Sequence, residues 1–388
     1  MTDTCNTSRK FVIGSQYFIY FGVMGIFLPY FNLYCFHIGF SGFQIGVLSA
    51  LRTMAIILFP LFWGAIADRF HIRKPIYILC NFISTAIWAF FIFTADFWPM
   101  LVITVFYGIF YAPIISFLEA FTIDVLGKEK KSYGSLRVWG SIAFITVVII
   151  LGKIIDLYSI KIVIILIFAG SLAQAFISTK IPDTVAFKKR SYTSRAKVLL
   201  KRRVVVFLFC AFLMLASHGA YYNFFSIHLA NMGYSSTFIG ITWALASFAE
   251  IIVMIKSDII FKRYSMENVI VFSFIVATLR WLILFSATSP VVILLSQTLH
   301  AITYGSFHVA SILYIDSLTP DNAKTLGQAA NNAVTYGLGM TVGFLISGCL
   351  YESMGSFALF FISAFIALVG GAVFKGSQMI EQRDAGTI

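Results

Sequence analysis

The chain has 388 residues, of which 60% are apolar or aromatic and 11% are charged, and its mean hydropathy is +0.91. A soluble domain is about half apolar and about a quarter charged, so this composition excludes an ordinary globular protein in water and indicates one solvated by lipid. The formal net charge of +12 would suit a nucleic-acid partner, but the basic residues lie in segments between apolar runs, which excludes a nucleic-acid surface.

The apolar runs are long and continuous, as Val138–Leu151 and Ala358–Phe374 illustrate. Because lipid offers the backbone no hydrogen-bond partners, a spanning segment is either a helix of ~20 residues or a strand of a closed barrel. Barrel strands alternate in polarity and these runs do not, so the sequence predicts helices. In chain order, the predicted spans are residues 11–36, 43–67, 75–95, 98–121, 134–152, 161–178, 204–230, 238–257, 266–287, 290–315, 325–351 and 356–374.

A polar, basic stretch at residues 180–203 separates the sixth and seventh predicted spans, whereas the other connections are short. We therefore predict an all-α membrane protein with twelve transmembrane helices in two pseudo-symmetric six-helix bundles. The bundles are residues 1–179 and 204–388, and the stretch between them is a cytoplasmic linker. No small-residue cleavage site follows the first apolar run, so we expect it to be retained as a span.

Lys and Arg are distributed unevenly between the two sides of this predicted topology. With the amino terminus in the cytoplasm, 23 of the 28 fall in cytoplasmic segments and two in external loops. The other three, Arg52, Arg137 and Arg280, lie within spans. Cytoplasmic loops of membrane proteins carry an excess of these residues. We therefore expect both termini to be cytoplasmic, in a multi-pass protein of the plasma membrane (the cell inner membrane), and an even number of spans.

The loop after the second span carries Gly64, Asp68, Arg69 and Arg73, followed by Lys74. This spacing resembles the GxxxD(R/K)xxxRK loop of the major facilitator superfamily. A glycine lets two helices approach closely, and an aspartate at a helix end can be held by a neighbouring helix terminus and arginines. These four residues are therefore predicted to form a conformational latch that holds the outward-facing form. The alternative is a charged turn that only sets topology.

The start of the fifth span, Tyr133–Ser141, resembles the YGxxRxxGS element of a narrower group. That group contains the oligosaccharide:proton symporters (lactose permease type) and the 3-phenylpropionate transporters. The oligosaccharide:proton symporters bind substrate with a carboxylate and an arginine, and the separation of these two residues in sequence is the same as that of Glu119 and Arg137 here. Phe144 stands where that family has a tryptophan that stacks on sugar, which weakens a sugar assignment.

The second half of the chain carries a further set of residues in the order of that family's proton-handling cluster. Glu250, Arg280 and His300 resemble its glutamate, arginine and histidine in the eighth, ninth and tenth spans. Thr303 stands where the family has a second glutamate, so the resemblance implies that proton transfer depends on Glu250, His300 and His218. The segment around His218 and the residue before Glu250 resemble the 3-phenylpropionate transporter group.

A charge at mid-membrane costs ~2.5–3.5 kcal/mol on insertion scales, so an ionisable residue in a span normally faces a partner or a wet cavity. Glu119 and Arg137 lie on consecutive spans and can meet. One hypothesis is that Arg137 binds a carboxylate or hydroxyl of the substrate while Glu119 orients it; the alternative is a static ion pair. Arg52 has no evident partner and either contributes to an anion-binding cavity or pairs with Glu119.

Glu250 and Arg280 form the second predicted pair. Burial disfavours the charged carboxylate and a nearby arginine favours it, so alternating contact with Arg280 would let Glu250 take up and release a proton. The alternative is a structural ion pair. His218 is either part of the proton relay or a hydrogen-bonding group that contacts Tyr221 or Tyr222.

The sequence thus predicts a secondary active transporter that takes up a small organic anion with protons, by alternating access. The three in-span arginines and the aromatic lining favour an aromatic carboxylate such as 3-phenylpropionate; a sugar or nucleoside symporter, or an exporter, is the alternative. No phosphate-binding loop, nucleophile–base spacing or convergent metal-ligand set is present, so we expect no enzyme activity, catalytic residue, cofactor or metal. The expected partners are the substrate, protons and the bilayer, and we expect a monomer.

Overall fold

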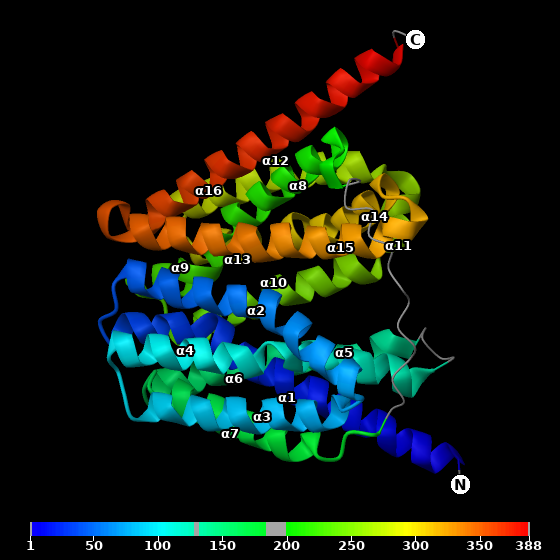
Figure 1. The fold of residues 1–388 in the computed structure, drawn as a ribbon. Coiled ribbons are helices and arrows are strands. Elements are labelled where there is room, and N and C mark those ends of the chain that lie inside the picture. Colours follow the sequence, from blue (N-terminus) through cyan, green and yellow to red (C-terminus); the bar gives the residue numbers. More distant parts are fainter. Residues whose placement is uncertain (1, 128–131, 184–198, 387–388) are drawn as a thin grey trace. The chain divides into compact units, whose positions relative to one another are not determined.

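The computed structural model describes residues 2–127, 132–183 and 199–386, and the described part of the chain is almost entirely helical (Figure 1). Most of the predicted linker, residues 184–198, lies outside the described residues. The helices up to residue 178 are α1 (Thr2–His37), α2 (Gly42–Phe70), α3 (Arg73–Ala89), η1 (Phe90–Ile92), α4 (Phe97–Tyr111), α5 (Pro113–Leu126), α6 (Tyr133–Leu157) and α7 (Ile162–Ser178). Those from residue 202 onward are α8 (Arg202–Ser217), α9 (Gly219–Asn231), α10 (Ser236–Ile255), α11 (Ser257–Arg263), α12 (Met266–Ser286), α13 (Pro290–Thr298), η4 (Ala301–Ser306), α14 (Phe307–Leu318), η5 (Asp321–Ala323), α15 (Lys324–Asn331), η6 (Asn332–Gly339) and α16 (Met340–Gly386).

Several of these helices join end to end into longer spans, with special residues at the joints. Pro113 is the first residue of α5 and follows α4 after a single residue, a position where its missing N–H is not needed for a helical hydrogen bond. The segments η4 and η6 are π-helical, with α-helix on both sides. Gly355 has φ 75°, a left-handed conformation that glycine adopts readily, and it makes a kink that divides α16 into two helical parts.

Nine helical stretches of the described residues are long and apolar enough to cross a membrane. One of them, Asp321–Arg383, runs for 63 residues through the break at Gly355, and the shorter apolar helix Ile162–Ser178 is additional. The prediction of an all-α membrane fold is confirmed. The number of twelve spans stays a prediction.

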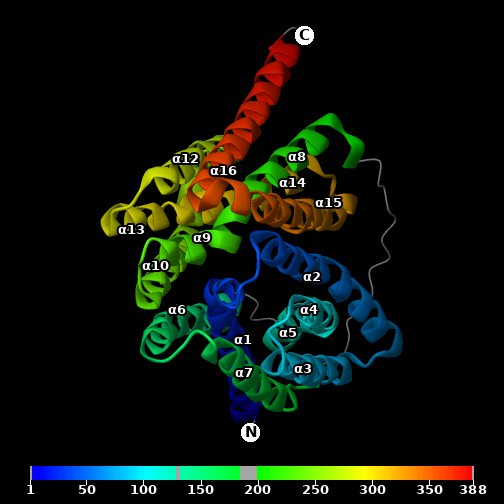
Figure 2. The same cartoon turned by 90° about the vertical axis from the view of Figure 1, so that its left-hand side faces the viewer.

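The chain folds as two compact units. Unit 1 comprises Met1–Phe40, Leu51–Lys189 and Leu229–Ala244; unit 2 comprises Ser41–Ala50, Arg190–His228 and Leu245–Ile388. Within unit 1, α1 packs against α5, α6 and α7 (Figure 2). Within unit 2, α16 packs against α8 and α12.

Glycines allow the closest helix packing in unit 2. A Cβ atom built on Gly343 of α16 would lie 2.5 Å from the carbonyl oxygen of Ala216 on α8 and 3.0 Å from the Cα of Gly219 on α9. These are backbone atoms, so no side-chain rotation would relieve the clash. The absence of a side chain at Gly343 is therefore what lets α16 approach this closely.

We expect Gly343→Ala to destabilise the protein by about 1–3 kcal/mol, because the helices must separate to admit the methyl group. The measurement is the melting temperature in detergent. The matched control is Gly376→Ala in the same helix, where a Cβ would meet no described atom within 4 Å. This control is expected to be neutral or slightly stabilising. Equal melting temperatures for the two variants would contradict the close packing.

Candidate functional site

Arg280 is a fully buried cation in unit 2, on α12. Its Nε donates to the Ser296 carbonyl (3.1 Å), and Nη2 donates to Gln297 Oε1 (3.2 Å). Its Nη1 donates to His300 Nδ1 (2.9 Å) and to Thr303 Oγ1 (3.2 Å). The acceptors are all neutral, so Arg280 keeps its full positive charge while its donors are satisfied. Thr303, which replaces a carboxylate of the family pattern, serves as one of them.

The bond from Arg280 determines the protonation state of His300. A guanidinium has donors only, so His300 Nδ1 must accept and its proton must be on Nε2. That Nε2 lies 3.4 Å from the Tyr222 hydroxyl and 3.8 Å from Glu250 Oε2. A proton on Nδ1 and the contact with Arg280 therefore exclude each other.

Glu250 reaches this cluster from α10, with 21% of its side chain exposed. A Cβ on Gly305 would lie 3.2 Å from Glu250 Cγ, so a glycine in the π-helical segment η4 makes room for the glutamate. Such π-helical insertions are frequent at functional sites. No ion pair within 4 Å joins Glu250 and Arg280 among the described contacts. In place of the direct ion pair predicted from the sequence, His300 lies between Arg280 and Glu250.

His218 is fully buried beside the cluster, at the end of α8. Its Nδ1 donates to the Met214 carbonyl at 2.8 Å, so the predicted hydrogen bond to Tyr221 or Tyr222 is not the one it makes. Its Nε2 is buried and has no hydrogen-bond partner within the described part of the protein. The ring centroids of His218 and His300 are 6.2 Å apart, so the two imidazoles are neighbours in the same cluster.

The predicted substrate residues on consecutive helices of unit 1 do not form a static ion pair. Glu119 on α5 is exposed, and no contact within 4 Å joins it to Arg137 on α6 among the described residues. The Arg137 guanidinium instead lies over the ring of Phe21, 3.7 Å from its centroid. Phe144 packs its backbone against Gly25 of α1, and its side chain is half-buried. Both charged groups therefore keep hydrogen-bonding capacity for a ligand.

Arg52 on α2 is half-buried in unit 1 and is not paired with Glu119. Its guanidinium carbon lies 4.3 Å from the centroid of the Phe27 ring. A cation–π contact contributes ~0.5–2 kcal/mol, less than the ~2.5–3.5 kcal/mol that a charge costs at mid-membrane. Of the two roles predicted for Arg52, an ion pair with Glu119 is not formed among the described residues, and a part in an anion-binding cavity stays a prediction.

Two of the four residues predicted for the latch, Asp68 and Arg73, form an ion pair, and Arg73 has a second partner that the loop motif does not contain. Arg73 at the start of α3 pairs with Asp124 of α5 at 2.8 Å and with Asp68 of α2 at 3.7 Å. Asp124 could have been found as an acid at the same predicted membrane face as the latch. Arg69 lies 5.5 Å from the ring of Phe70. A Cβ on Gly64 would meet no described atom within 4 Å, so the close helix approach predicted there is not present in this structure.

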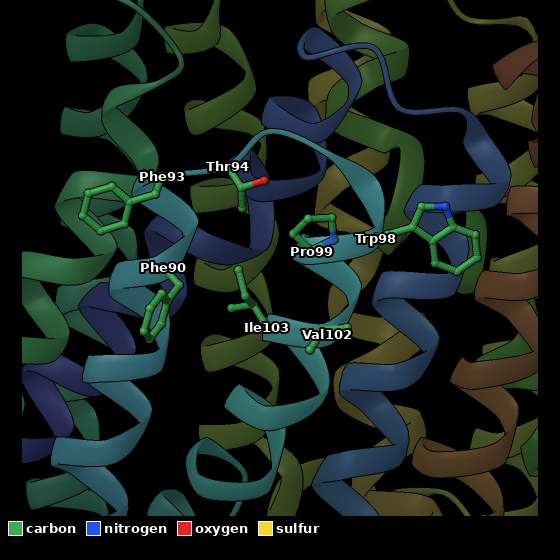
Figure 3. A pocket seen from close by; sticks show the side chains of 7 residues that line it. All are labelled: Phe90, Phe93, Thr94, Trp98, Pro99, Val102 and Ile103. Atoms are coloured by element: carbon green, nitrogen blue, oxygen red, sulfur yellow. The ribbon is translucent and has the colours of Figure 1, made fainter.

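An apolar hollow on unit 1 lies where η1 connects to α4 (Figure 3). It is lined by Phe90, Phe93, Thr94, Trp98, Pro99, Val102 and Ile103. Phe93 and Trp98 are 82% and 73% exposed. Exposed aromatic rings at the ends of spans are typical of the membrane–water interface. None of the predicted substrate residues lines this hollow, and we assign it to lipid contact.

Helices long and apolar enough to cross a membrane that also carry buried charged clusters are typical of polytopic transporters. The chain belongs to the MFS_1 like family, whose family model matches residues 12–362. It is 28% identical over 357 residues to the Probable 3-phenylpropionic acid transporter of Escherichia coli (strain K12), covering 91% of this chain and 93% of that protein. It is 23% identical to the maltose permease of Geobacillus stearothermophilus, with 91% of each covered. The crystal structure of the nucleoside transporter NupG matches with a TM-score of 0.84 at 18% identity, over 95% of this chain and 98% of that one.

The protein is therefore a secondary transporter for small molecules and a multi-pass protein of the bacterial inner membrane, and it is not an enzyme. The family and the fold predicted from the sequence are confirmed. The matched relatives are named for a phenyl-substituted acid, for sugars and for nucleosides, so the family alone leaves the substrate open.

Proposed function

We propose that the protein takes up a small organic anion together with protons, by alternating access, with both termini in the cytoplasm. The chain Arg280–His300–Glu250 is the observation that carries the proton coupling. Because His300 Nδ1 accepts from Arg280 at 2.9 Å, a proton can occupy that nitrogen only after Arg280 has moved away. Protonation at this cluster is therefore linked to a movement of α12 relative to η4. A carrier needs such a link to couple the flow of protons to the flow of substrate.

Glu250 is the group that exchanges the proton in this proposal, and Tyr222 and His300 orient it. The carboxylate is partly exposed, so it can be reached by water, and it lies 3.8 Å from the Nε2–H of His300. His218 contributes its buried Nε2 as an acceptor next to the same cluster. Arg73, Asp68 and Asp124 act as the conformational latch, with Arg69 and Gly64 beside them.

The proposed substrate is an aromatic carboxylate of the 3-phenylpropionate kind, bound by unit 1 through Glu119, Arg137, Phe144 and Arg52. The similarity to the phenylpropionic acid transporter and two half-buried arginines in one unit support this assignment. The second candidate is a sugar or nucleoside. It is favoured by the similarity to maltose and xanthosine permeases and by the proximity of Glu119 to Arg137, which makes that region nearly neutral overall.

The test is uptake of labelled 3-phenylpropionate into proteoliposomes with and without an inward proton gradient. We expect accumulation that requires the gradient. No uptake by folded protein would remove the aromatic-acid assignment, and maltose and xanthosine would then be tested in the same vesicles. Uptake that is equal with and without the gradient would remove proton coupling.

Arg137→Lys is expected to raise the substrate concentration at half-maximal uptake by about tenfold or more. Lysine keeps the charge but loses the planar guanidinium, whose carbon lies 3.7 Å from the Phe21 ring centroid, and its several fixed hydrogen-bond donors. The control is Arg263→Lys on α11, which is exposed. An unchanged half-saturation concentration in Arg137→Lys would contradict the substrate role.

A further inference from the structure

Arg52 is the in-span arginine that has a buried nitrogen without a hydrogen-bond partner among the described residues. It has no ion pair within 4 Å in the described structure, and its Nε atom is buried without a hydrogen-bond partner. The guanidinium contacts the Phe27 ring at 4.3 Å. Arg280, in contrast, makes four hydrogen bonds from its three nitrogens, and the charge of Arg137 acts on the nearby carboxylate of Glu119.

Three tyrosines from two other helices lie near enough to Arg52 for its charge to act on them. Tyr20 of α1 stacks on Tyr111 of α4 with centroids 5.6 Å apart, and Tyr111 stacks on Tyr107 at 4.7 Å. All three rings are buried, and the charge of Arg52 acts on their hydroxyl groups. We call these three tyrosines and Phe27, whose ring contacts the Arg52 guanidinium, the aromatic box.

The box has the two components that recognition of an organic acid requires. A guanidinium binds a carboxylate through two parallel hydrogen bonds, and tyrosine hydroxyls add donors to the same oxygens. Flat ring faces accept an aromatic ligand by stacking or edge contact. A half-buried positive charge without an ion pair in the protein is most stable when a ligand brings the counter-charge.

We infer that Arg52 holds the negative charge of the substrate, and that the aromatic box makes the site selective for the anion of an acid with a flat apolar part. This inference rests on the proposed function and deepens it. Arg137, which is close to Glu119 and lies on Phe21, then positions the rest of the substrate without being its counter-charge. The carboxylate-specific part of the affinity belongs to Arg52, and the part common to acids and neutral analogues belongs to Arg137.

The experiment compares 3-phenylpropionate with its neutral carboxamide, which has nearly the same shape, by calorimetric titration of the purified full chain. The variants are Arg52→Gln, Arg52→Lys and Arg137→Lys. In the wild type we expect the acid to bind at least about tenfold more tightly than the amide. Arg52→Gln should remove this preference by weakening the acid alone, and Arg52→Lys should keep part of it. Arg137→Lys should weaken acid and amide by the same factor.

Retained amide binding shows that Arg52→Gln is folded, and Tyr111→Phe, which keeps the ring, should weaken the acid a few-fold. If Arg52→Gln leaves the ratio of acid affinity to amide affinity unchanged, the role of Arg52 is wrong but the proposed function stands. A ratio near one in the wild type would mean the same. Wild-type protein that binds neither compound would overturn the aromatic-acid substrate and, with it, the inference. If the affinity ratios are as expected but uptake does not require the proton gradient, only the proposal of proton coupling is wrong.

Discussion

Glu250→Gln is expected to abolish accumulation of the substrate against its gradient while leaving exchange across the membrane intact. The amide has the size of the carboxylate and keeps an acceptor oxygen near His300 Nε2, but it cannot take up and release a proton. With one pH unit across the vesicle, a carrier that couples one proton to one substrate can concentrate the substrate about tenfold. The variant should bring the substrate to equal concentrations inside and outside the vesicle without accumulating it.

The measurement pairs two assays on the same vesicles: accumulation under an inward proton gradient, and counterflow of labelled against unlabelled substrate. Glu267→Gln at the start of α12 is the matched control, because it removes a carboxylate of the same unit outside the cluster. Normal accumulation by Glu250→Gln would show that another group carries the proton. Loss of both activities would assign Glu250 to binding or folding.

Arg280→Lys is expected to lower the rate of uptake at least about 100-fold. The guanidinium reaches Ser296, Gln297, His300 and Thr303 from three nitrogen atoms, and a single ammonium group cannot reach them all. A hydrogen bond to a charged group contributes ~1.5–3 kcal/mol, so the loss of two of them accounts for a factor of this size. The unbonded His300 Nδ1 would also be free to take a proton without any movement of residue 280.

The rate is measured under the proton gradient, and counterflow in the same vesicles separates two outcomes. If Arg280 links protonation to rearrangement, counterflow should fall less than gradient-driven uptake. Arg263→Lys, on the exposed helix α11, serves as the control for an arginine-to-lysine exchange in the same unit. If Arg280→Lys accumulates substrate to the wild-type level, the positive charge alone is sufficient and the planar arrangement of guanidinium donors has no role.

The predicted site residues differ in how far the sequence could place them. The spacing of Gly64, Asp68 and Arg73 predicted a latch within one loop, but the shortest ion pair of Arg73 is made with Asp124, 51 residues further along the chain. The order of Glu250, Arg280 and His300 predicted one cluster, but it could not show that the imidazole stands between the two charges. Thr303 departs from the family pattern in sequence, yet in space it satisfies a donor of Arg280.

The sequence by itself determined that this protein is a helical membrane transporter. Hydropathy, span length and the positions of Lys and Arg act along the chain, because the bilayer treats each segment almost independently of the others. The partners of the buried charges were decided only by tertiary structure. A hydrogen bond depends on distances of a few tenths of an ångström between side chains on different helices, and these distances follow from the close packing of helices at residues such as Gly305 and Gly343. For this reason the contact of Arg280 with His300, and the aromatic surroundings of Arg52, could not be derived from spacing.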